Sequence, residues 1–332
     1  MILCLGIEST AHTFSSSVVE LREGYDGKIL SDVRSVYKPE KGSGIHPREA
    51  SRHHMKFAGS IVRKSLEDAK VSMNEVDVIA YSRGPGLGPC LKVGGVVARA
   101  LSSYFKKPLV PVNHAIGHIE LGCLLTNCYE PIVLLISGGH TLITSFSLKR
   151  WRIFGETLDL TIGQLLDQFG RFLGYSSPSG MIIEELAKKG KKFIQLPYSV
   201  KGNDVSFSGL LTSAKQKTKN ENIEDVCYSL QEVGFAMLCE AYERAIAFVG
   251  KEEGLVVGGV AANKRLAEML DEVSKRHGID MHIVPPYYSG DCGAQIAWTG
   301  LLAYKAGVRI MPEEADVIQS WRIDKVDIPW RS

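Results

Sequence analysis

Short apolar runs separated by polar turns dominate the first 36 residues of the chain. Residues 2–8 read Ile-Leu-Cys-Leu-Gly-Ile-Glu, and the segments 13–21 and 29–36, which mix apolar residues with serines and charged residues, lie on either side of the polar stretch 22–28. Aliphatic runs of this length, bounded by turn residues, are typical of β-strands. The pattern therefore predicts three consecutive strands.

From residue 47 the apolar spacing becomes helical. Pro47 is a good first residue for a helix, and apolar residues from Ala50 to Ala69 share one face of a helix that ends near Lys70. The rest of this half predicts alternating strands and helices, namely a strand at 76–82, a helix at about 91–105, a strand at 109–112 and a helix ending near 125.

The second half repeats this order. Three strands are predicted at 132–136, 141–146 and 151–154, and a helix at about 161–173. After a further segment, the pattern predicts helices at about 223–250, 263–277 and 291–306, with strands at 255–258 and 281–284 between them. Clustered strands suit antiparallel pairing, whereas strands that alternate with helices suit parallel pairing. Each half is therefore expected to form one mixed sheet.

Two mixed sheets in tandem resemble the actin-like ATPase fold, an α/β architecture of two duplicated ribonuclease-H-like lobes with a nucleotide cleft between them. A single large doubly wound sheet is the alternative. The length of 332 residues suits two lobes. We expect the first lobe at 1–125, completed by about 300–332, and the second at 126–299, with an inserted region at about 175–222.

Composition narrows the class of protein only a little. Hydrophobic residues make up 45% of the chain and charged residues 23%, which excludes disordered and coiled-coil chains. The seven cysteines form no CxxC pair, and no apolar run approaches the length of a membrane span. We therefore expect reduced thiols, a cytoplasmic location and no membrane partner.

The net charge of +2 indicates no polyanionic partner, but the inserted region is locally basic. Residues 185–220 contain eight lysines, at 188, 189, 191, 192, 201, 215, 217 and 219, against Glu185 and Asp204. Such a run is either a solvated surface or a contact to a nucleic-acid backbone.

The segment His114-Ala-Ile-Gly-His118 places two imidazoles four residues apart, on one face of the predicted helix. Asp291, before the last predicted helix, is the candidate third ligand, although it would also serve as the N-cap of that helix. Two histidines and a carboxylate suit iron, zinc or manganese. A zinc protease is disfavoured because Ala115 stands where the HExxH signature has glutamate.

Three glycine-rich or polar turns are candidate ligand contacts. Ser137-Gly138-Gly139 lies between two predicted strands, and Ser9-Thr10 lies at the same place in the first half, so the two turns together suit a phosphate. Asn263 follows the segment Gly258-Gly-Val-Ala-Ala and is a candidate contact for a base or ribose, or else the N-cap of the next helix.

Taken together, these segments resemble the tRNA threonylcarbamoyladenosine transferase family. The resemblance covers nearly the whole chain and rests on an ordered set of motifs: Gly6-Ile-Glu-Ser-Thr-Ala-His-Thr, Arg83-Gly-Pro-Gly-Leu-Gly-Pro, Val112-Asn-His-Ala-Ile-Gly-His-Ile-Glu120, Ser137-Gly-Gly, Gly155-Glu-Thr-Leu-Asp159, Ser206-Phe-Ser-Gly-Leu210, Gly258-Gly-Val-Ala-Ala-Asn263 and Gly290-Asp-Cys-Gly-Ala294. In detail it is most similar to the archaeal and eukaryotic branch, the catalytic subunit of the KEOPS complex.

The resemblance implies transfer of threonylcarbamoyl from threonylcarbamoyl-AMP to the adenosine 3′ of the anticodon, in tRNAs that read codons beginning with adenine. It implies a metal, iron above zinc or manganese, held by His114, His118 and Asp291. It also implies an adenylate site made by Leu135, Ile136, Ser137, Gly138, Gly139, Asp167, Gly180, Glu184 and Asn263, which would also take ATP, ADP or AMP.

The implied partners are tRNA and KEOPS-type subunits, including a small atypical kinase. No residue stands out as a general base. A kinase-like phosphotransferase and a nucleotide-switched scaffold share the expected fold and are the alternative functions.

Overall fold

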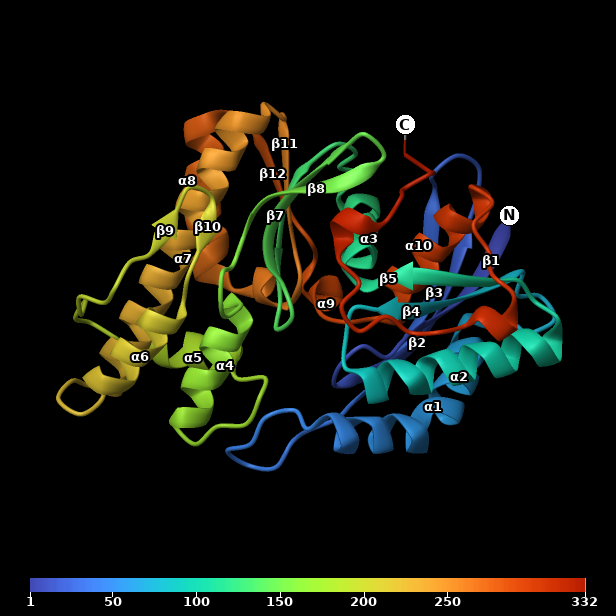
Figure 1. The fold of residues 1–332 in the computed structure, drawn as a ribbon, viewed down its shortest axis with the longest axis horizontal. Helices are drawn as coiled ribbons and strands as arrows, with labels where there is room; N and C mark the ends of the chain where they lie inside the picture. The colour runs from blue at the N-terminus through green and yellow to red at the C-terminus, as the bar shows by residue number, and fades with distance from the viewer. Residues whose placement is uncertain (332) are drawn as a thin grey trace.

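The computed structural model describes residues 1–331, which form two five-stranded mixed sheets side by side (Figure 1). The strands of the first sheet are β1 (Ile2–Glu8), β2 (Thr13–Leu21), β3 (Gly27–Val36), β4 (Val78–Gly84) and β5 (Leu109–Asn113). Those of the second are β6 (Ile132–Ile136), β7 (Thr141–Ser147), β8 (Arg150–Glu156), β11 (Glu253–Val257) and β12 (Asp280–Ile283).

The two sheets have one topology. The first has the strand order β3-β2-β1-β4-β5 and the second β8-β7-β6-β11-β12. In each sheet the first three strands pair antiparallel, the fourth pairs with the first in parallel, and the fifth pairs with the fourth in parallel. The predicted duplication is confirmed, and the single doubly wound sheet is wrong. The lobe boundaries stay a prediction.

The helices also follow the predicted order. They are α1 (Pro47–Ala69), α2 (Gly88–Phe105), α3 (His114–Thr126), α4 (Ile162–Phe172), α7 (Ile223–Val249), α8 (Lys264–His277) and α10 (Gly293–Lys305). Five further elements were not predicted: α5 (Gly180–Ala187), α6 (Ser208–Lys217), the hairpin strands β9 (Val200–Lys201) and β10 (Asp204–Val205), and the four-residue α9 (Pro286–Ser289). These elements are short, so their apolar patterns are weak.

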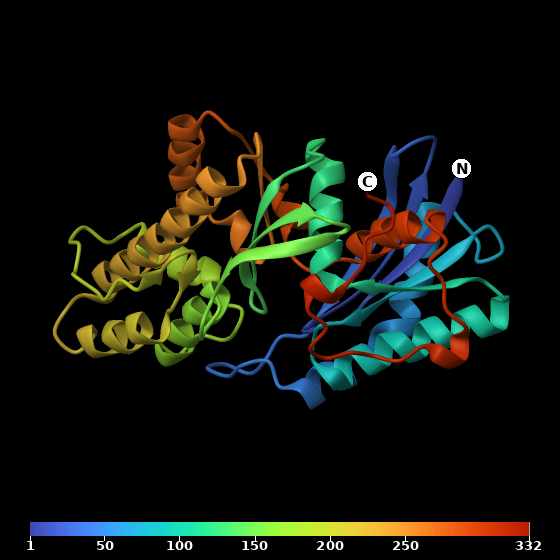
Figure 2. The ribbon, with the colours of Figure 1, turned by 45° about the horizontal axis from the view of Figure 1, so that its top comes forward.

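Helices α3 and α10 are buried almost all round and pack on each other. Helix α10 lies on β1, where a Cβ added to Gly6 would stand 2.4 Å from the backbone nitrogen of Ala297. Helix α3 faces the second sheet, because a Cβ added to Gly122 would stand 2.7 Å from the Val257 side chain. The last helix of the first half therefore contacts the other half's sheet (Figure 2).

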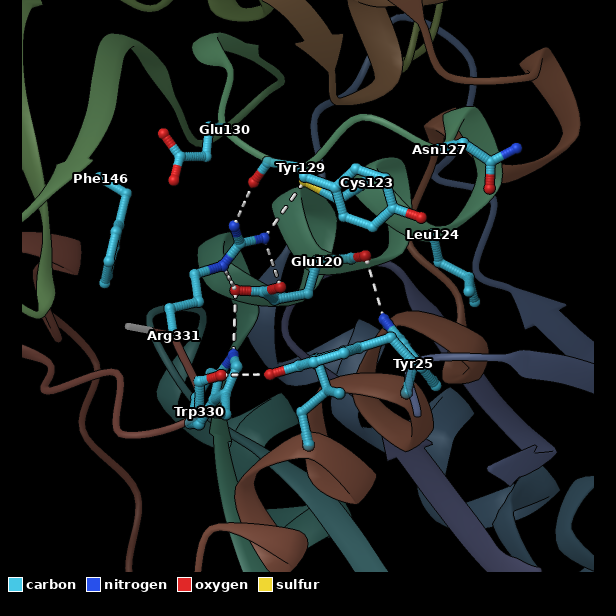
Figure 3. A pocket seen from close by; sticks show the side chains of 12 residues that line it. Tyr25, Glu120, Cys123, Leu124, Asn127, Tyr129, Glu130, Phe146, Trp330 and Arg331 are labelled. Atoms are coloured by element: carbon cyan, nitrogen blue, oxygen red, sulfur yellow. Dashed lines mark hydrogen bonds and ion pairs between the residues drawn. The ribbon is translucent and has the colours of Figure 1, made fainter. Parts of the chain in front are cut away.

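The last residues of the described chain cross between the two lobes. Ile318 donates a backbone hydrogen bond to Arg83, and Ile328 donates one to Lys149. Arg331 then reaches Glu120 of α3 beside a pocket of about 200 Å³ (Figure 3). Within residues 1–331, no helix is both long and apolar enough to cross a membrane.

Candidate metal centre and adenylate site

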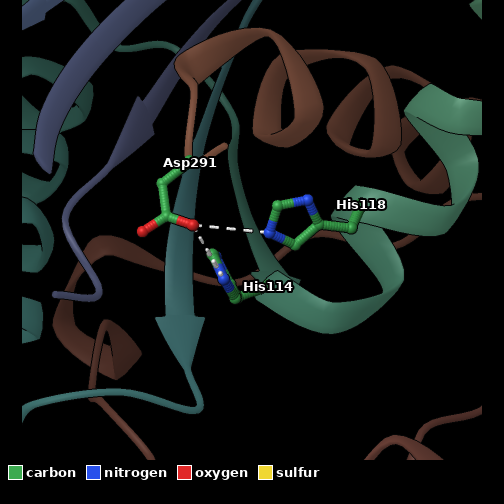
Figure 4. Close-up of side chains that lie close together, drawn as sticks. All are labelled: His114, His118 and Asp291. Atoms are coloured by element: carbon green, nitrogen blue, oxygen red, sulfur yellow. Dashed lines mark ion pairs between the residues drawn. The ribbon is translucent and has the colours of Figure 1, made fainter. Parts of the chain in front are cut away.

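His114, His118 and Asp291 meet at one point (Figure 4). The nitrogen and oxygen atoms that they offer all lie within 4.8 Å of one another. Asp291 Oδ1 is 3.5 Å from His114 Nε2 and 3.4 Å from His118 Nε2. Asp291 is not a helix cap, because α10 begins at Gly293 with Cys292 as its N-cap. Both histidines come from the first turns of α3, where Asn113 caps the helix.

The donor set fits a divalent transition metal. His118 Nε2 is buried and has no hydrogen-bond partner among the described residues, which is costly unless a metal occupies the space in front of it. Two imidazoles and one carboxylate leave coordination positions for substrate oxygens.

Glu8 orients the first histidine from behind. The buried imidazole Nδ1 of His114 lies 3.0 Å from Glu8 Oε2 and donates to it, which leaves Nε2 facing Asp291. Burial acts to lower the pKa of His114, but the carboxylates of Glu8 and Asp291 outweigh it and raise that pKa to about 9. Burial likewise acts to raise the pKa of Asp291, but His114 and His118 hold it well below its ordinary range.

His140 brings the second lobe to this centre. Its ring stacks on that of His114, with the centroids 6.3 Å apart, and its Nδ1 is buried without a hydrogen-bond partner in the described chain. Burial, with the charge of His114, lowers the pKa of His140 to about 3, so the ring is neutral at physiological pH. Neither His140 nor Glu8 was predicted as a site residue from the sequence. Their sole signal was their position at strand ends beside the two polar turns.

The turn Ser137–Gly139 is only partly free to bind an anion. Ser137 N donates to His140 O, and Gly139 N donates to Ser137 Oγ. Among residues 1–331 only Gly138 of this trio keeps an unused N–H, and Gly138 is exposed beside the N-terminus of α4. Leu135 and Ile136 have fully buried side chains, so they position the turn and leave contact with a ligand to its backbone.

The matching turn in the first lobe does not offer the free N–H groups expected of it. Ser9 N donates to Ser82 Oγ at 3.0 Å, and Thr10 N donates to Glu8 Oε1 at 2.5 Å. Ser9 and Thr10 are also buried. In this conformation the turn supports His114, since Thr10 Oγ1 is 3.4 Å from His114 Nδ1.

The other predicted adenylate-binding residues, Asp167, Gly180, Glu184 and Asn263, lie in the second lobe. The two carboxylates each accept a backbone hydrogen bond from a residue next to Gly180 or Asn263. Asp167 Oδ1 accepts a hydrogen bond from Ser179 N, beside Gly180, and Glu184 Oε1 accepts one from Lys264 N. Burial raises the pKa of Asp167. Asp167 Oδ2 and Glu184 Oε2 accept no hydrogen bond within the described part of the chain. Each carboxylate thus keeps one oxygen for a hydroxyl group.

Asn263 is largely committed to the protein. Its side chain caps α8 by accepting from Leu266 N at 3.2 Å, and its amide donates to Gln231 Oε1 at 3.0 Å. Asn263 is therefore the N-cap of α8, as one of the two interpretations of the sequence predicted. A contact to a ligand stays a prediction.

Glu120 is excluded as the general base of a protease. It lies on α3 two residues beyond His118, but it forms a buried ion pair with Arg331 at 2.7 Å and accepts from Trp330 Nε1 at 3.1 Å (Figure 3). Its carboxylate is therefore not available to a water molecule at the histidine pair.

The fold and the site place the chain among the actin-like ATPase-fold proteins. It is similar to HypF from T. kodakarensis, with 15% identity, a TM-score of 0.65, and coverage of 92% of this chain and 48% of that one. It is also similar to the activator of the 2-hydroxyisocaproyl-CoA dehydratase from Clostridium difficile, with 9% identity, a TM-score of 0.53, and coverage of 92% and 97%. At these identities the likeness shows the fold alone.

Sequence comparison defines the family within that class. Residues 28–298 match the family model described as tRNA N6-adenosine threonylcarbamoyltransferase. Relatives of that name include one from Caldivirga maquilingensis, 47% identical over 99% of this chain and 98% of its own length, and one from Metallosphaera sedula, 48% identical over 99% and 100%. The chain belongs to the tRNA N6-adenosine threonylcarbamoyltransferase family.

A longer relative from Methanothermobacter thermautotrophicus is named a probable bifunctional tRNA threonylcarbamoyladenosine biosynthesis protein. It is 47% identical over 99% of this chain, which spans 61% of that protein's length.

Proposed function

We propose that this chain transfers threonylcarbamoyl from threonylcarbamoyl-AMP to N6 of the adenosine 3′ of the anticodon, in tRNAs that read codons beginning with adenine. Membership of the family supports this function. The structural observation that carries it is the meeting of His114, His118 and Asp291 opposite His140 of the second lobe. A kinase-like phosphotransferase would hold magnesium by carboxylates and phosphates, and a scaffold needs no such donor set.

The metal is proposed to be iron, as the family resemblance implies, with zinc or manganese as donor-compatible alternatives. When bound, it would supply Lewis-acid chemistry to oxygens of the adenylate substrate. Glu8 holds the proton on His114 Nδ1, so Nε2 is the nitrogen that gives up its proton to bind a metal. Gly138 N–H donates to an anionic oxygen of the substrate, and the free oxygens of Asp167 and Glu184 accept from the ribose hydroxyls.

The transfer step needs little chemistry from the side chains. The adenosine amine forms a bond to the carbonyl carbon of the threonylcarbamoyl group. The bond from that carbon to the phosphate oxygen breaks, and AMP leaves with the electron pair. The amine loses one proton, and no general base is assigned. Alignment of the two substrates supplies a large part of such an acceleration.

We further propose that the chain receives its adenylate from another enzyme and works with KEOPS-type subunits, among them a small atypical kinase. The bifunctional relative supports a functional link between this chain and a second activity. We assign the reaction to the cytoplasm, where seven free, buried cysteines are stable.

The purified full chain is first analysed for bound metal. It is then incubated with synthetic threonylcarbamoyl-AMP and an unmodified tRNA transcript. Mass spectrometry of the digested tRNA should detect threonylcarbamoyladenosine with the wild-type chain and none with His114→Ala/His118→Ala. Threonine, bicarbonate and ATP in place of the adenylate should give little product until partner subunits are added. Product formation by the double variant contradicts the assigned centre, and efficient product from the three precursors contradicts the dependence on another enzyme.

A further inference from the structure

A second cluster of metal-ligating side chains lies beyond the opposite end of α3. One ligand atom each of Cys128, Glu253 and His282 lies within 4.8 Å of the other two. Cys128 is ten residues beyond His118, which along a helix corresponds to about 15 Å. The cluster is therefore separate from the centre at the start of α3, and nothing in the proposed transfer reaction uses it.

The sheet register places two of the three side chains on one face. Leu255 of β11 pairs with His282 of β12, so these residues point to the same side, and Glu253, two residues before Leu255, points there as well. This side faces α3, because a Cβ added to Gly122 would stand 3.2 Å from the Leu255 side chain.

The end of α3 brings the cysteine to this face. Helix α3 stops at Thr126 because Asn127 adopts a left-handed conformation with φ of 55°. Cys128 N then donates to Cys123 O, and the Cys128 side chain is fully buried. The turn therefore presents a thiol to Glu253 and His282, which remain partly exposed.

The spacing fits tetrahedral zinc. His282 Nε2 is 3.8 Å from Glu253 Oε1. Zinc bonds to nitrogen and oxygen of about 2.0–2.2 Å place two tetrahedral ligand atoms about 3.3–3.6 Å apart, so a shift of a few tenths of an ångström by these partly exposed side chains completes the geometry. Glu253 is already oriented, because its Oε2 accepts from the backbone N–H groups of Tyr129 and Glu130 at 3.2 Å each. The carboxylate thus keeps Oε1 for the cluster.

Other readings of the cluster fit less well. A nucleophilic Cys–His pair needs an accessible thiol, but the Cys128 side chain is fully buried. An ion pair between Glu253 and a nearby basic side chain is a second alternative. The neighbouring basic residues already have partners, since Arg331 pairs with Glu120 at 2.7 Å and Lys251 pairs with Glu130 at 2.6 Å. A divalent cation would instead turn the buried thiol into a stable thiolate ligand.

We propose that Cys128, Glu253 and His282 bind a zinc ion that joins the end of α3 to the β11–β12 edge of the second sheet. A water molecule is the fourth ligand, since His282 and Glu253 lie at the partly exposed side. The site has a structural role, because it fixes the helix that carries His114 and His118 at its other end.

Cobalt substitution separates this site from the other centre. Cobalt bound by a thiolate gives a sulfur-to-metal charge-transfer band in the near ultraviolet, and His114, His118 and Asp291 supply no sulfur. The full-length His114→Ala/His118→Ala chain, freed of metal, is titrated with cobalt and then with zinc. We expect the band to reach saturation at one equivalent and to vanish when zinc displaces the cobalt.

Further substitutions in that background identify the ligands. Cys128→Ser should abolish the band, and His282→Ala should weaken cobalt binding at least tenfold, whereas Cys227→Ser, a buried thiol of α7, should leave it unchanged. His282 is 29% exposed, so His282→Ala keeps the test valid if Cys128→Ser does not fold. Zinc at a hundredfold excess over its Kd should also raise Tm by about 2–4 °C only while Cys128 and His282 are present. Absence of the band, or its persistence in Cys128→Ser, overturns the proposal.

Discussion

The two lobes share one topology, yet their equivalent turns have opposite roles. The turn after β1 is buried, and its Ser9 and Thr10 N–H groups are satisfied inside the protein. The turn after β6 is exposed at Gly138, whose N–H is unused in the described chain. The first turn supports His114 through Glu8, and the second leaves an exposed N–H group that we propose binds the ligand. A duplicated backbone therefore does not imply duplicated chemistry, because the side chains behind each turn decide which groups remain free.

The largest effect is expected at the metal ligands that the first turn supports. His114→Ala/His118→Ala removes two of three donors, so metal retention and transfer should fall by more than about a hundredfold, with the fold intact. Metal analysis and circular dichroism check this. His53→Ala, which removes a half-buried imidazole of α1, is the control and should retain metal. Full metal occupancy in the double variant would contradict the assigned ligands.

A smaller loss is expected when the support itself is weakened. Glu8→Gln keeps the shape of the side chain but removes the charge that holds His114 Nδ1–H, so metal affinity should fall about 10- to 100-fold. Competition with a chelator measures the change. Glu20→Gln, on the neighbouring strand β2, should have no effect. If Glu8→Gln binds metal as tightly as the wild type, the first turn has no supporting role.

Two glycines test the second turn. A Cβ at Gly163 would stand 2.6 Å from Ser137 O, so Gly163→Ala should displace the turn and lower the free energy of unfolding by about 1–3 kcal/mol. A Cβ at Gly138 meets no atom within 4 Å, so Gly138→Ala should leave stability within about 0.5 kcal/mol and reduce adenylate binding several-fold. Urea unfolding measures the stability of each variant, and nucleotide titration measures its adenylate binding. Unchanged nucleotide binding in Gly138→Ala would show that this turn does not face the ligand.

The inserted region with its eight lysines belongs to the second lobe, so it is a further difference between the two lobes. Its charge is lower in space than along the chain, because Lys188 lies 3.5 Å from Glu184 and Lys192 lies 2.8 Å from Glu221, and both carboxylates are outside the counted window 185–220. Lys189 and Lys191 are exposed and form no ion pair within residues 1–331.

Reversing these two of the unpaired lysines, Lys189→Glu/Lys191→Glu, should therefore weaken tRNA binding and reduce its salt dependence by about two units of slope. Filter binding at several salt concentrations measures this, and nucleotide binding should stay unchanged. Lys92→Glu/Lys106→Glu on α2 and its end applies the same charge change to the first lobe. An equal loss in both variants would mean that only the net charge matters.

The smallest effect concerns acid stability of the insertion. Burial acts to raise the pKa of Asp159, but hydrogen bonds from Ser206, Ser208 and Phe207 N hold it well below its ordinary range. A depressed pKa adds stability above about pH 4, and this stability is lost as the pH falls further. Asp159→Asn should thus lower Tm at pH 7, and the difference from wild type should shrink below pH 4. A difference that does not change with pH would show that charge is not the cause, and Asp68→Asn on α1 is the exposed control.

The sequence by itself determined the order of the elements and predicted the three residues of the candidate metal centre. Regular apolar spacing predicts strands and long helices because burial repeats with the period of each element. Two histidines four residues apart share a helix face whatever lies around them, and Asp291 was found from its place before a helix. The short helices α5 and α6 were not predicted, because two to three turns contain too few apolar positions to show a period.

Only the tertiary structure decided which polar groups are free and which are used. Glu8 and His114 are 106 residues apart in sequence, and no local pattern connects a strand end to a helix start at that distance. The same holds for His140 against His114, for Asn263 against Gln231, and for Lys192 against Glu221. Hydrogen bonds and ion pairs act over a few ångströms between any residues that the fold brings together, whereas sequence patterns record only contacts within one element. For that reason the motifs predicted the candidate metal and adenylate residues, but they did not predict that the equivalent turns of the two lobes have different roles.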